Sequence, residues 1–500
     1  MFKGHPKGLF VLFFTEMWER FGFYTMLSVF VYYLGENFKW DAATVTNVYG
    51  IFLAAVYFTP IIGGWIADNL LGYGKTIIIG AVVMGIGYAL LAVPTGLPAQ
   101  VFIALVIISI GNGLFKANIS VLVGNLYAHS QGSLKDAGYN IFYMGINIGA
   151  FYAPMAAAGI RRFLMENYNV SLAQGYNAAF GVAAAGMVVS LLIFTIFRKL
   201  YVEADYRSKE KVNIEKDLTL TKSQEKERVF ALLTIFAIVI FFWMSFHQNG
   251  AALSLFARDY THSIVNGITY ILFDVAGLHA LIALLLGGAV VLNRMTKLKT
   301  KLIGGLFFAA GLIILIYKAG SLPGQNTIAP EQFQSFNPMF IVLLTPLIVG
   351  MYSYLNRKDK EPSSPAKIGI GMIITAIAFI IMVVASQGLP SVHSIAGSKS
   401  ALTVSPFWLI GTYFTLTIAE LNLSPMGLSF VSKVAPPHMK GLMMGGWFGA
   451  TAVGNYLSGF VGRFYQNWEL WQFFLLLVIT SLIAAGLVMV FLKKLKHATR

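Results

Sequence analysis

The chain has 500 residues, of which 57% are hydrophobic and only 11% are charged. A soluble protein of this length needs far more charge to cover its surface, so the composition indicates a polytopic membrane protein. The absence of cysteine excludes disulfides, thiol chemistry and cysteine-based metal sites, and we expect no metal site.

Six apolar stretches in the first part of the chain are each long enough to cross about 30 Å of hydrocarbon. They predict transmembrane helices at residues 8–33, 44–67, 75–93, 99–125, 137–160 and 175–198. The first apolar run is too long for a cleavable signal peptide and has no small-residue cleavage site, so we expect this helix to be retained. Residues 1–198 are therefore predicted to form an N-terminal six-helix bundle.

A polar segment at residues 199–228, dense in charges of both signs, is predicted to be a cytoplasmic linker. It leads to a C-terminal part over residues 229–500. Eight further helices are predicted there, at residues 229–256, 264–292, 302–318, 333–356, 366–386, 405–430, 438–464 and 470–493. Two helical bundles joined by a linker are typical of transporters that rock around a central cavity.

Lysine and arginine concentrate in alternate loops. One set holds Lys7, Lys75, Lys135, the linker and the clusters at residues 294–301, 357–360, 433–440 and 493–496. The opposite loops are nearly bare apart from Lys39, Arg161, Arg162, Arg258 and Lys399. Because positively charged loops stay in the cytoplasm, both termini are predicted to be cytoplasmic. The same distribution accounts for the net charge of +15, so we expect no nucleic-acid partner.

The first helix carries charges within its apolar run, in the segment EMWERFGFY. Glu16, Glu19, Arg20 and Tyr24 are spaced so that they share one helical face. A charge at mid-bilayer costs about 2.5–3.5 kcal/mol, so this face should point into a cavity or toward counter-charges. One interpretation is a buried ion-pair cluster that only holds helices together. Two acids against one base, however, leave one group uncompensated and free to titrate.

Polar residues also interrupt other predicted helices. They are Lys116 in GNGLFKANIS, Asn147 in FYMGINIGAF, Asn337 in NPMFIVLLTP, Glu420 and Ser424 in AELNLSPMGLS, and Trp447 in GGWFGATAVGN. Any one of them alone is more often a packing or kink residue. Together they supply positive groups from the first half and a carboxylate from the second, which suits a zwitterionic ligand.

These motifs, in this order, resemble the proton-dependent oligopeptide transporter family of the major facilitator superfamily. EMWERFGFY is similar to the family signature ExxERFxYY, and the loop GGWIADNLLGYGK, with Asp68, is similar to a superfamily motif. The resemblance implies the major facilitator fold, with 12 core helices in two six-helix bundles plus two extra helices.

The resemblance also implies site residues. It implies proton coupling by Glu16, Glu19, Arg20 and Lys116, and binding of a peptide carboxylate by Arg20 and Lys116. It implies binding of the peptide amino terminus by Glu420 with Asn147 and Asn337. The remaining implied pocket residues are Tyr24, Tyr57, Ser424 and Trp447.

Three positions depart from the family pattern. Phe23 replaces a tyrosine, Leu27 stands where many members have an arginine, and His247 stands where members often have an acid. The cation lost at position 27 and the anion lost at position 247 compensate each other, because loss of one alone would leave the other charge unpaired. One hypothesis is that His247 takes over proton coupling from the acid. The alternative is a neutral histidine that is hydrogen-bonded in the pocket.

The extra helix pair is predicted at about residues 264–318, between core helices seven and eight. The linker is too short to hold it, and an even number of crossings preserves the topology. Asp274 and His279 in this pair are therefore expected to be structural or interfacial.

The sequence predicts a proton-coupled symporter in the inner (plasma) membrane that imports dipeptides and tripeptides by alternating access. The alternative within the superfamily is a transporter of another small organic ion or a drug-like compound. A channel and a membrane enzyme are the other classes, but HExxH, P-loop and nucleophile-elbow motifs are missing from the chain. We expect a monomer with no cofactor other than the coupling proton.

Overall fold

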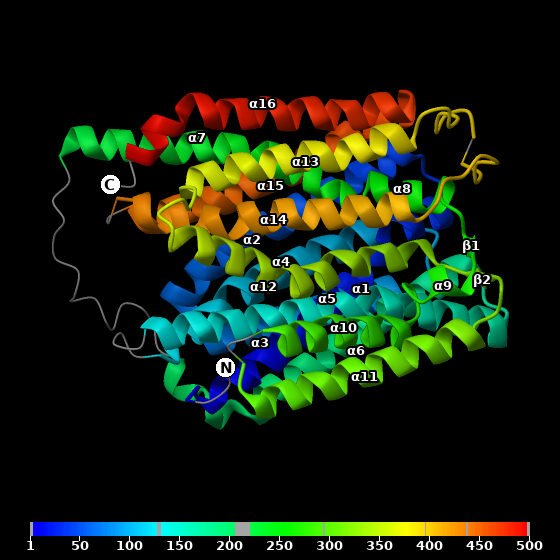
Figure 1. Ribbon diagram of the computed structural model, residues 1–500, viewed down its shortest axis with the longest axis horizontal. Coiled ribbons are helices and arrows are strands. Elements are labelled where there is room, and N and C mark those ends of the chain that lie inside the picture. The colour runs from blue at the N-terminus through cyan, green and yellow to red at the C-terminus, as the bar shows by residue number, and fades with distance from the viewer. Residues whose placement is uncertain are drawn as a thin grey trace.

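The computed structural model describes residues 4–127, 132–205, 221–293, 296–395, 397–436 and 439–497. Within these ranges the long helices run side by side, accompanied by one two-stranded antiparallel sheet (Figure 1). Residues 206–220 of the predicted linker and Arg294 lie outside the described residues. We call residues 4–205 the N-terminal half and residues 221–497 the C-terminal half.

Fourteen of the helices in the described residues have 18 residues or more, as the apolar stretches predicted. The N-terminal half comprises α1 (Lys7–Phe38), α2 (Ala42–Ile66), η1 (Ala67–Leu71), α3 (Tyr73–Ala92), α4 (Pro98–Asn125), α5 (Gly132–Tyr168), α6 (Leu172–Ile196), η3 (Arg198–Leu200) and η4 (Val202–Ala204). The C-terminal half comprises α7 (Lys222–Phe246), η6 (His247–Asn249), α8 (Ala252–Asp259), β1 (Ile264–Val265), α9 (Gly267–Tyr270), α10 (Val275–Leu292), α11 (Leu298–Ser321), β2 (Asn326–Thr327), η7 (Pro330–Ser335), α12 (Phe336–Asn356), α13 (Ser364–Ala385), α14 (Phe407–Val434), α15 (Lys440–Asn467) and α16 (Leu470–His497). Eleven helices of the described chain are long and apolar enough to span a membrane.

Short polar side chains mark where several of these helices begin. Asp41 accepts a hydrogen bond from the Thr44 backbone at the start of α2. Ser171 and Thr221 form capping boxes at the starts of α6 and α7. Each cap satisfies backbone N–H groups that have no partner within the helix, so the local sequence sets these boundaries.

Two predicted helices in the C-terminal half are wrong in detail. The helix predicted over residues 229–256 breaks after Phe246 into the 3₁₀ turn η6 and the short α8. The helix predicted over residues 264–292 begins only at Val275, where Asp274 caps it by accepting from the Gly277 backbone. The preceding residues form β1 and α9 instead, because Ile264 and Val265 pair with β2.

Helices pack mainly within their own half. In the N-terminal half α1 packs against α5 and α6, and in the C-terminal half α13 packs against α14 and α16. The exceptions that join the halves are chiefly α2 against α15 and α5 against η7 and α12. A Cβ atom on Gly50 of α2 would lie only 2.6 Å from the Cα atom of Gly459 on α15, so this crossing requires glycine.

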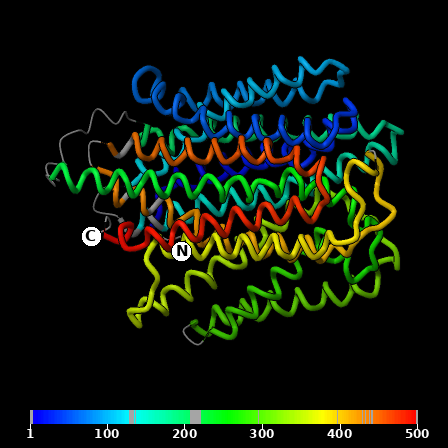
Figure 2. Tube along the Cα trace, turned by 90° about the horizontal axis from the view of Figure 1, so that it is seen from above, coloured from blue at the N-terminus to red at the C-terminus, as the bar shows by residue number. Residues whose placement is uncertain are grey.

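The extra pair, α10 and α11, forms a hairpin at the edge of the molecule (green, lower edge of Figure 2). Within it, Lys318 Nζ lies 3.0 Å from Asp274 Oδ2. His279 hydrogen-bonds Tyr152 of α5 and stacks on its ring. Asp274 and His279 thus hold the hairpin together and fix it to its neighbour.

The start of α1 and the end of α16 lie at the same end of the molecule, which we call the terminal end (left in Figure 1). At the opposite, far end, hydrogen bonds between described residues tie the two halves together. Arg161 of α5 forms an ion pair with the fully buried Glu331 of η7, with 2.7 Å between Nη2 and Oε1. Tyr32 donates to the Ser254 carbonyl at 3.0 Å. The structure is therefore closed at its far end.

Replacing Glu331 by glutamine is expected to loosen this closure. The substitution leaves the partly buried Arg161 without its counter-ion in the closed state, at a cost of up to about 3 kcal/mol. Since the chain has no cysteine, a single Leu27→Cys probe in the cavity can report opening to the far side. We expect at least about a 10-fold faster reaction with a membrane-impermeant thiol reagent added at that side.

The matched control for this prediction is Glu36→Gln. It removes an exposed ion pair with Lys39 in the loop that follows α1. Exposed pairs contribute little, so this variant should react at the rate of the parent. Equal rates for Glu331→Gln and the parent would show that the Arg161–Glu331 pair does not hold the far end closed.

Candidate functional site

A cavity of about 280 Å³ lies between the two halves. Its wall is built from α1, α2, α4 and α5 on one side and from α7, η6, η7, α12, α14 and α15 on the other. Of the residues predicted for the site, it includes Glu16, Arg20, Tyr24, Tyr57, Lys116, Asn147, His247, Asn337, Glu420, Ser424 and Trp447. The remaining predicted residue, Glu19, is fully buried behind the wall.

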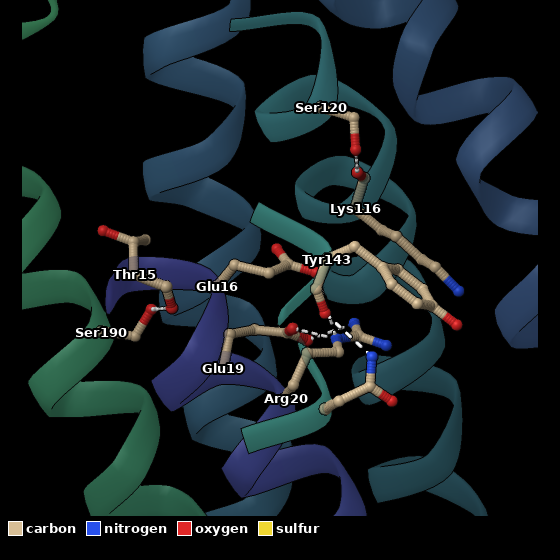
Figure 3. Close-up of polar contacts among 9 residues, drawn as sticks. Thr15, Glu16, Glu19, Arg20, Lys116, Ser120, Tyr143 and Ser190 are labelled. Atoms are coloured by element: carbon tan, nitrogen blue, oxygen red, sulfur yellow. Dashed lines mark hydrogen bonds and ion pairs between the residues drawn. The ribbon is translucent and has the colours of Figure 1, made fainter. Parts of the chain in front are cut away.

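The charged face of α1 forms a compact ion-pair cluster (Figure 3). Arg20 Nη2 donates to Glu19 Oε1 at 2.6 Å, and Arg20 Nε donates to the other Glu19 oxygen. Glu16 Oε1 lies 3.5 Å from Arg20 Nε, while Glu16 Oε2 is buried without a hydrogen-bond partner among the described residues. Glu19 thus balances the charge of Arg20, and Glu16 is the acid with an oxygen still open to a further donor.

Asn112 of α4 is a member of this cluster that the sequence analysis missed. It is fully buried, and the amide orientation that satisfies both of its polar atoms accepts from Arg20 Nη2 at 3.0 Å. In the same orientation it donates to the Val56 carbonyl of α2 at 3.3 Å. Asn112 precedes Lys116 by one helical turn, and this spacing could have placed Asn112 on the same face of α4 as Lys116.

Replacing Asn112 by leucine is expected to raise the KM for transported substrate about 10-fold, because Arg20 loses a buried hydrogen-bond acceptor. Asn118→Leu is the matched control. Asn118 is equally buried on α4 but donates to the Gly63 and Leu114 carbonyls, away from Arg20. The control should lower the yield of folded protein without changing KM. An unchanged KM in Asn112→Leu would remove Asn112 from the site.

Lys116 reaches the cavity from α4, apart from the ion-pair cluster. Its Nζ lies over the ring of Tyr57, 4.2 Å from the ring centroid. The ion pairs of the described residues give it no carboxylate within 4.0 Å, and Figure 3 draws no contact between its ammonium group and Glu16 or Glu19. Lys116 is therefore a cation that faces the cavity without a counter-ion in contact.

His247 approaches the same tyrosine from the C-terminal half. It is 8% exposed, its ring stacks on Trp243 with centroids 5.4 Å apart, and its centroid lies 6.0 Å from that of Tyr57. Its Nε2 atom is buried and has no hydrogen-bond partner in the part of the chain that the structure describes. The break between α7 and η6 puts His247 at the end of a helix, where its ring lines the cavity.

Glu420 of α14 supplies the carboxylate on the C-terminal side. Asn337 of α12 donates to Glu420 Oε2 at 2.9 Å and to Thr417 Oγ1 at 3.1 Å. The predicted partnership of Asn337 with Glu420 is therefore present as a direct hydrogen bond. Asn147 lies on the wall but donates to the Tyr143 carbonyl of its own helix at 2.9 Å.

The cavity thus has two charged sides from opposite halves of the chain. Arg20 and Lys116 come from the N-terminal half, and Glu420 comes from the C-terminal half. Trp447 and Tyr24 add aromatic wall between them. Within the described residues, no cluster of three or more histidine, aspartate or glutamate side chains has a geometry suited to a metal ion. The arrangement fits a small molecule that carries both a negative and a positive group.

Comparison with known proteins gives matches along the whole chain. A dipeptide and tripeptide permease A of Proteus mirabilis is 31% identical over 468 residues, covering 91% of this chain and 85% of that protein. An uncharacterized transporter, YclF of Bacillus subtilis, is 30% identical over 513 residues, covering 100% of this chain and 96% of that protein. The crystal structure of a mutant of a peptide transporter POT in complex with alafosfalin superposes with a TM-score of 0.75. The two sequences are 26% identical, and the superposition covers 100% of this chain and 96% of the peptide transporter chain.

The sequence profile of the POT family matches residues 74–213 and 319–472. These two segments contain the α4 and α5 walls of the cavity and most of its wall in α12, α14 and α15. The fold of the solved relative covers the remaining helices, including α1 with its ion-pair cluster. The resemblance inferred from the sequence motifs is confirmed, and the chain belongs to the POT family of transporters.

Proposed function

We propose that this protein is a proton-coupled symporter that imports dipeptides, tripeptides or peptide-like compounds by alternating access. The observation that carries the proposal is one cavity with cations from one half and a carboxylate from the other. Peptides with different side chains share two charged ends, so a site that binds the ends accepts many of them. Relatives named as dipeptide and tripeptide permeases support the substrate class.

In the proposed binding mode the peptide carboxylate lies near Lys116 and Arg20. The amino terminus lies near Glu420, which Asn337 orients, and Asn147 contacts the same end. The peptide backbone then spans the space walled by Tyr24, Tyr57, Ser424 and Trp447.

We assign proton coupling to the cluster of Glu16, Glu19, Arg20 and Lys116. The three acids Glu16, Glu19 and Glu420 outnumber the two bases Arg20 and Lys116, so the set carries one excess negative charge, which one proton neutralises. Glu16 is the natural carrier, because it lines the cavity and has an oxygen without a partner. Protonation there would release Arg20 from part of its ion pairing and couple the proton to substrate binding.

We infer that the terminal end faces the cytoplasm and that the protein lies in the inner membrane, since the basic loops gather at that end. The closed far end would then be the outer side of the membrane, so the cavity is shut off from the outside in this structure. Residues 1–198 would rock against residues 229–500, and Pro425 within α14 offers a point where that helix bends. The cavity is complete within one chain, which supports a monomer as the transporting unit.

The test is uptake of L-alanyl-L-alanine into proteoliposomes with and without an imposed pH gradient, acidic outside. The proposal predicts accumulation above the external concentration only with the gradient, together with alkalinisation of the outer medium. Saturable uptake without any response to the gradient would contradict proton coupling.

A second candidate substrate is a small organic anion that has no amino group. The specific observation in its favour is Lys116, which no acid of the described chain contacts. The same proteoliposomes distinguish the two: an N-acetylated dipeptide should compete poorly if Glu420 binds the amino terminus, and fully if the substrate is simply an anion.

A further inference from the structure

We propose that His247 is a direct ligand of the substrate carboxylate and forms an anion subsite with Lys116. The sequence leaves open a proton carrier or a neutral, hydrogen-bonded histidine, and this inference gives His247 a third role as a substrate-binding residue. It rests on the proposed function and deepens it, because it names the residues that select the negative end of the substrate.

The charge balance around the two cations is the first step. Arg20 is held by both oxygens of Glu19, lies near Glu16 and is further bonded to Asn112. Its positive charge is already compensated inside the protein. Lys116 has the face of Tyr57 as its contact, and the ion pairs of the described residues give it no acid. An incoming carboxylate therefore gains more at Lys116 than at Arg20.

The geometry of His247 is the second step. Trp243 stacks on one side of the imidazole, and Phe246 meets it edge-on with centroids 5.6 Å apart. This packing fixes the ring and leaves Nε2 buried without a partner. A buried polar atom without a partner is costly, and the His247 ring lines the cavity, so a small movement that opens Nε2 to the cavity would give it a ligand atom as partner. Both the cationic imidazole and the tautomer with hydrogen on Nε2 can donate from this atom.

The third step joins the two residues. Lys116 and His247 both approach the ring of Tyr57, one from each half of the chain. An acid at position 247 would neutralise Lys116 and repel a carboxylate. The imidazole does not neutralise Lys116, so the positive charge of Lys116 stays available to the substrate carboxylate. The imidazole also adds a second hydrogen-bond donor for the same carboxylate.

The subsite therefore selects a substrate end that is both negative and able to accept two hydrogen bonds. A free carboxylate or a phosphonate meets this requirement, and a terminal carboxamide does not, because it has no charge to offer Lys116. Closure of the two halves would bring donors from both sides onto one anion, so substrate binding itself favours the closed cavity.

Three substitutions of His247 separate the two roles in proteoliposomes. His247→Gln can place an amide N–H near the position of Nε2, and we expect its KM for L-alanyl-L-alanine to stay within about 3-fold of the parent. His247→Leu removes the donor and should raise KM about 10-fold or more. His247→Glu pairs with Lys116 and should raise KM further. All three should retain accumulation driven by the pH gradient at saturating substrate.

The outcomes that overturn the inference are equally specific. Loss of gradient-driven accumulation in His247→Gln with unchanged exchange of peptide would make His247 a proton carrier. An unchanged KM in His247→Leu would show that His247 does not touch the substrate. His279→Leu, on the α10–α11 hairpin outside the cavity, is the control and should leave KM unchanged.

A binding measurement with sulfate isolates the anion subsite from the rest of the site. Sulfate should raise the melting temperature of the parent protein in detergent, and Lys116→Ala or His247→Leu should remove this stabilisation. Glu420→Gln should keep it. If sulfate raises the melting temperature of His247→Leu as much as that of the parent, His247 does not belong to an anion subsite. If the parent imports no peptide but still shows this sulfate pattern, the proposed function fails while the anion subsite stands.

Discussion

Replacing Lys116 by alanine is expected to lower kcat/KM for L-alanyl-L-alanine about 100-fold or more, the largest effect of any single change at the site. Lys116 is the cation in the cavity that no described acid contacts, so its charge is fully available to the substrate carboxylate. Initial rates of gradient-driven uptake into proteoliposomes measure the loss. A C-amidated dipeptide should be affected far less, because it has no carboxylate for Lys116 to bind.

Lys367→Ala is the matched control for this prediction. Lys367 is a buried lysine that, like Lys116, lies over a tyrosine ring, with Nζ 3.9 Å from the centroid of Tyr352, but it pairs with Glu361 outside the central cavity. Its removal should reduce the yield of folded protein and leave KM unchanged. Equal losses of kcat/KM in Lys116→Ala and Lys367→Ala would mean that the effect of Lys116 is one of folding.

Replacing Glu420 by glutamine is the second change with a large expected effect. The amide keeps the shape of the side chain and a hydrogen bond with Asn337 but removes the negative charge that faces the cavity. We expect kcat/KM for peptides with a free amino group to fall about 30-fold or more, as for truncation of one partner of a buried charge pair. The measurement is uptake competition between free and N-acetylated dipeptides.

N-acetylated peptides provide the internal control, because they lack the positive group that Glu420 would bind. The parent should discriminate strongly against them, and Glu420→Gln should bind the free and the acetylated peptide about equally. If Glu420→Gln discriminates as well as the parent does, then another group binds the amino terminus.

Much of this fold follows from apolar length alone. Each stretch that can cross the bilayer became a long helix, because lipid leaves the backbone few other ways to satisfy its hydrogen bonds. The cavity residues could also be predicted from the sequence, since a charge such as Glu16 or Glu420 in an apolar helix must face polar surroundings. The structure gathers them around one cavity, and the roles given to them remain predictions.

The features that the sequence did not reveal depend on partners distant in the chain. Asn112 belongs to the cluster only because α4 packs where its amide meets Arg20 of α1. Arg161 and Glu331 are 170 residues apart, and only the assembled halves bring them together at the far end. The division of labour between Glu19, which is paired, and Glu16, which has a free oxygen, depends on side-chain geometry that spacing alone cannot supply.

The central claim is that the two halves bind opposite ends of one small substrate in the shared cavity. The most direct measurement compares inhibition constants of four forms of alanyl-alanine against uptake by the unmodified protein: free, N-acetylated, C-amidated and capped at both ends. The account predicts that each single cap weakens inhibition about 30-fold or more. It also predicts that the doubly capped form is the weakest of the four. Inhibition that is insensitive to either cap would contradict the account.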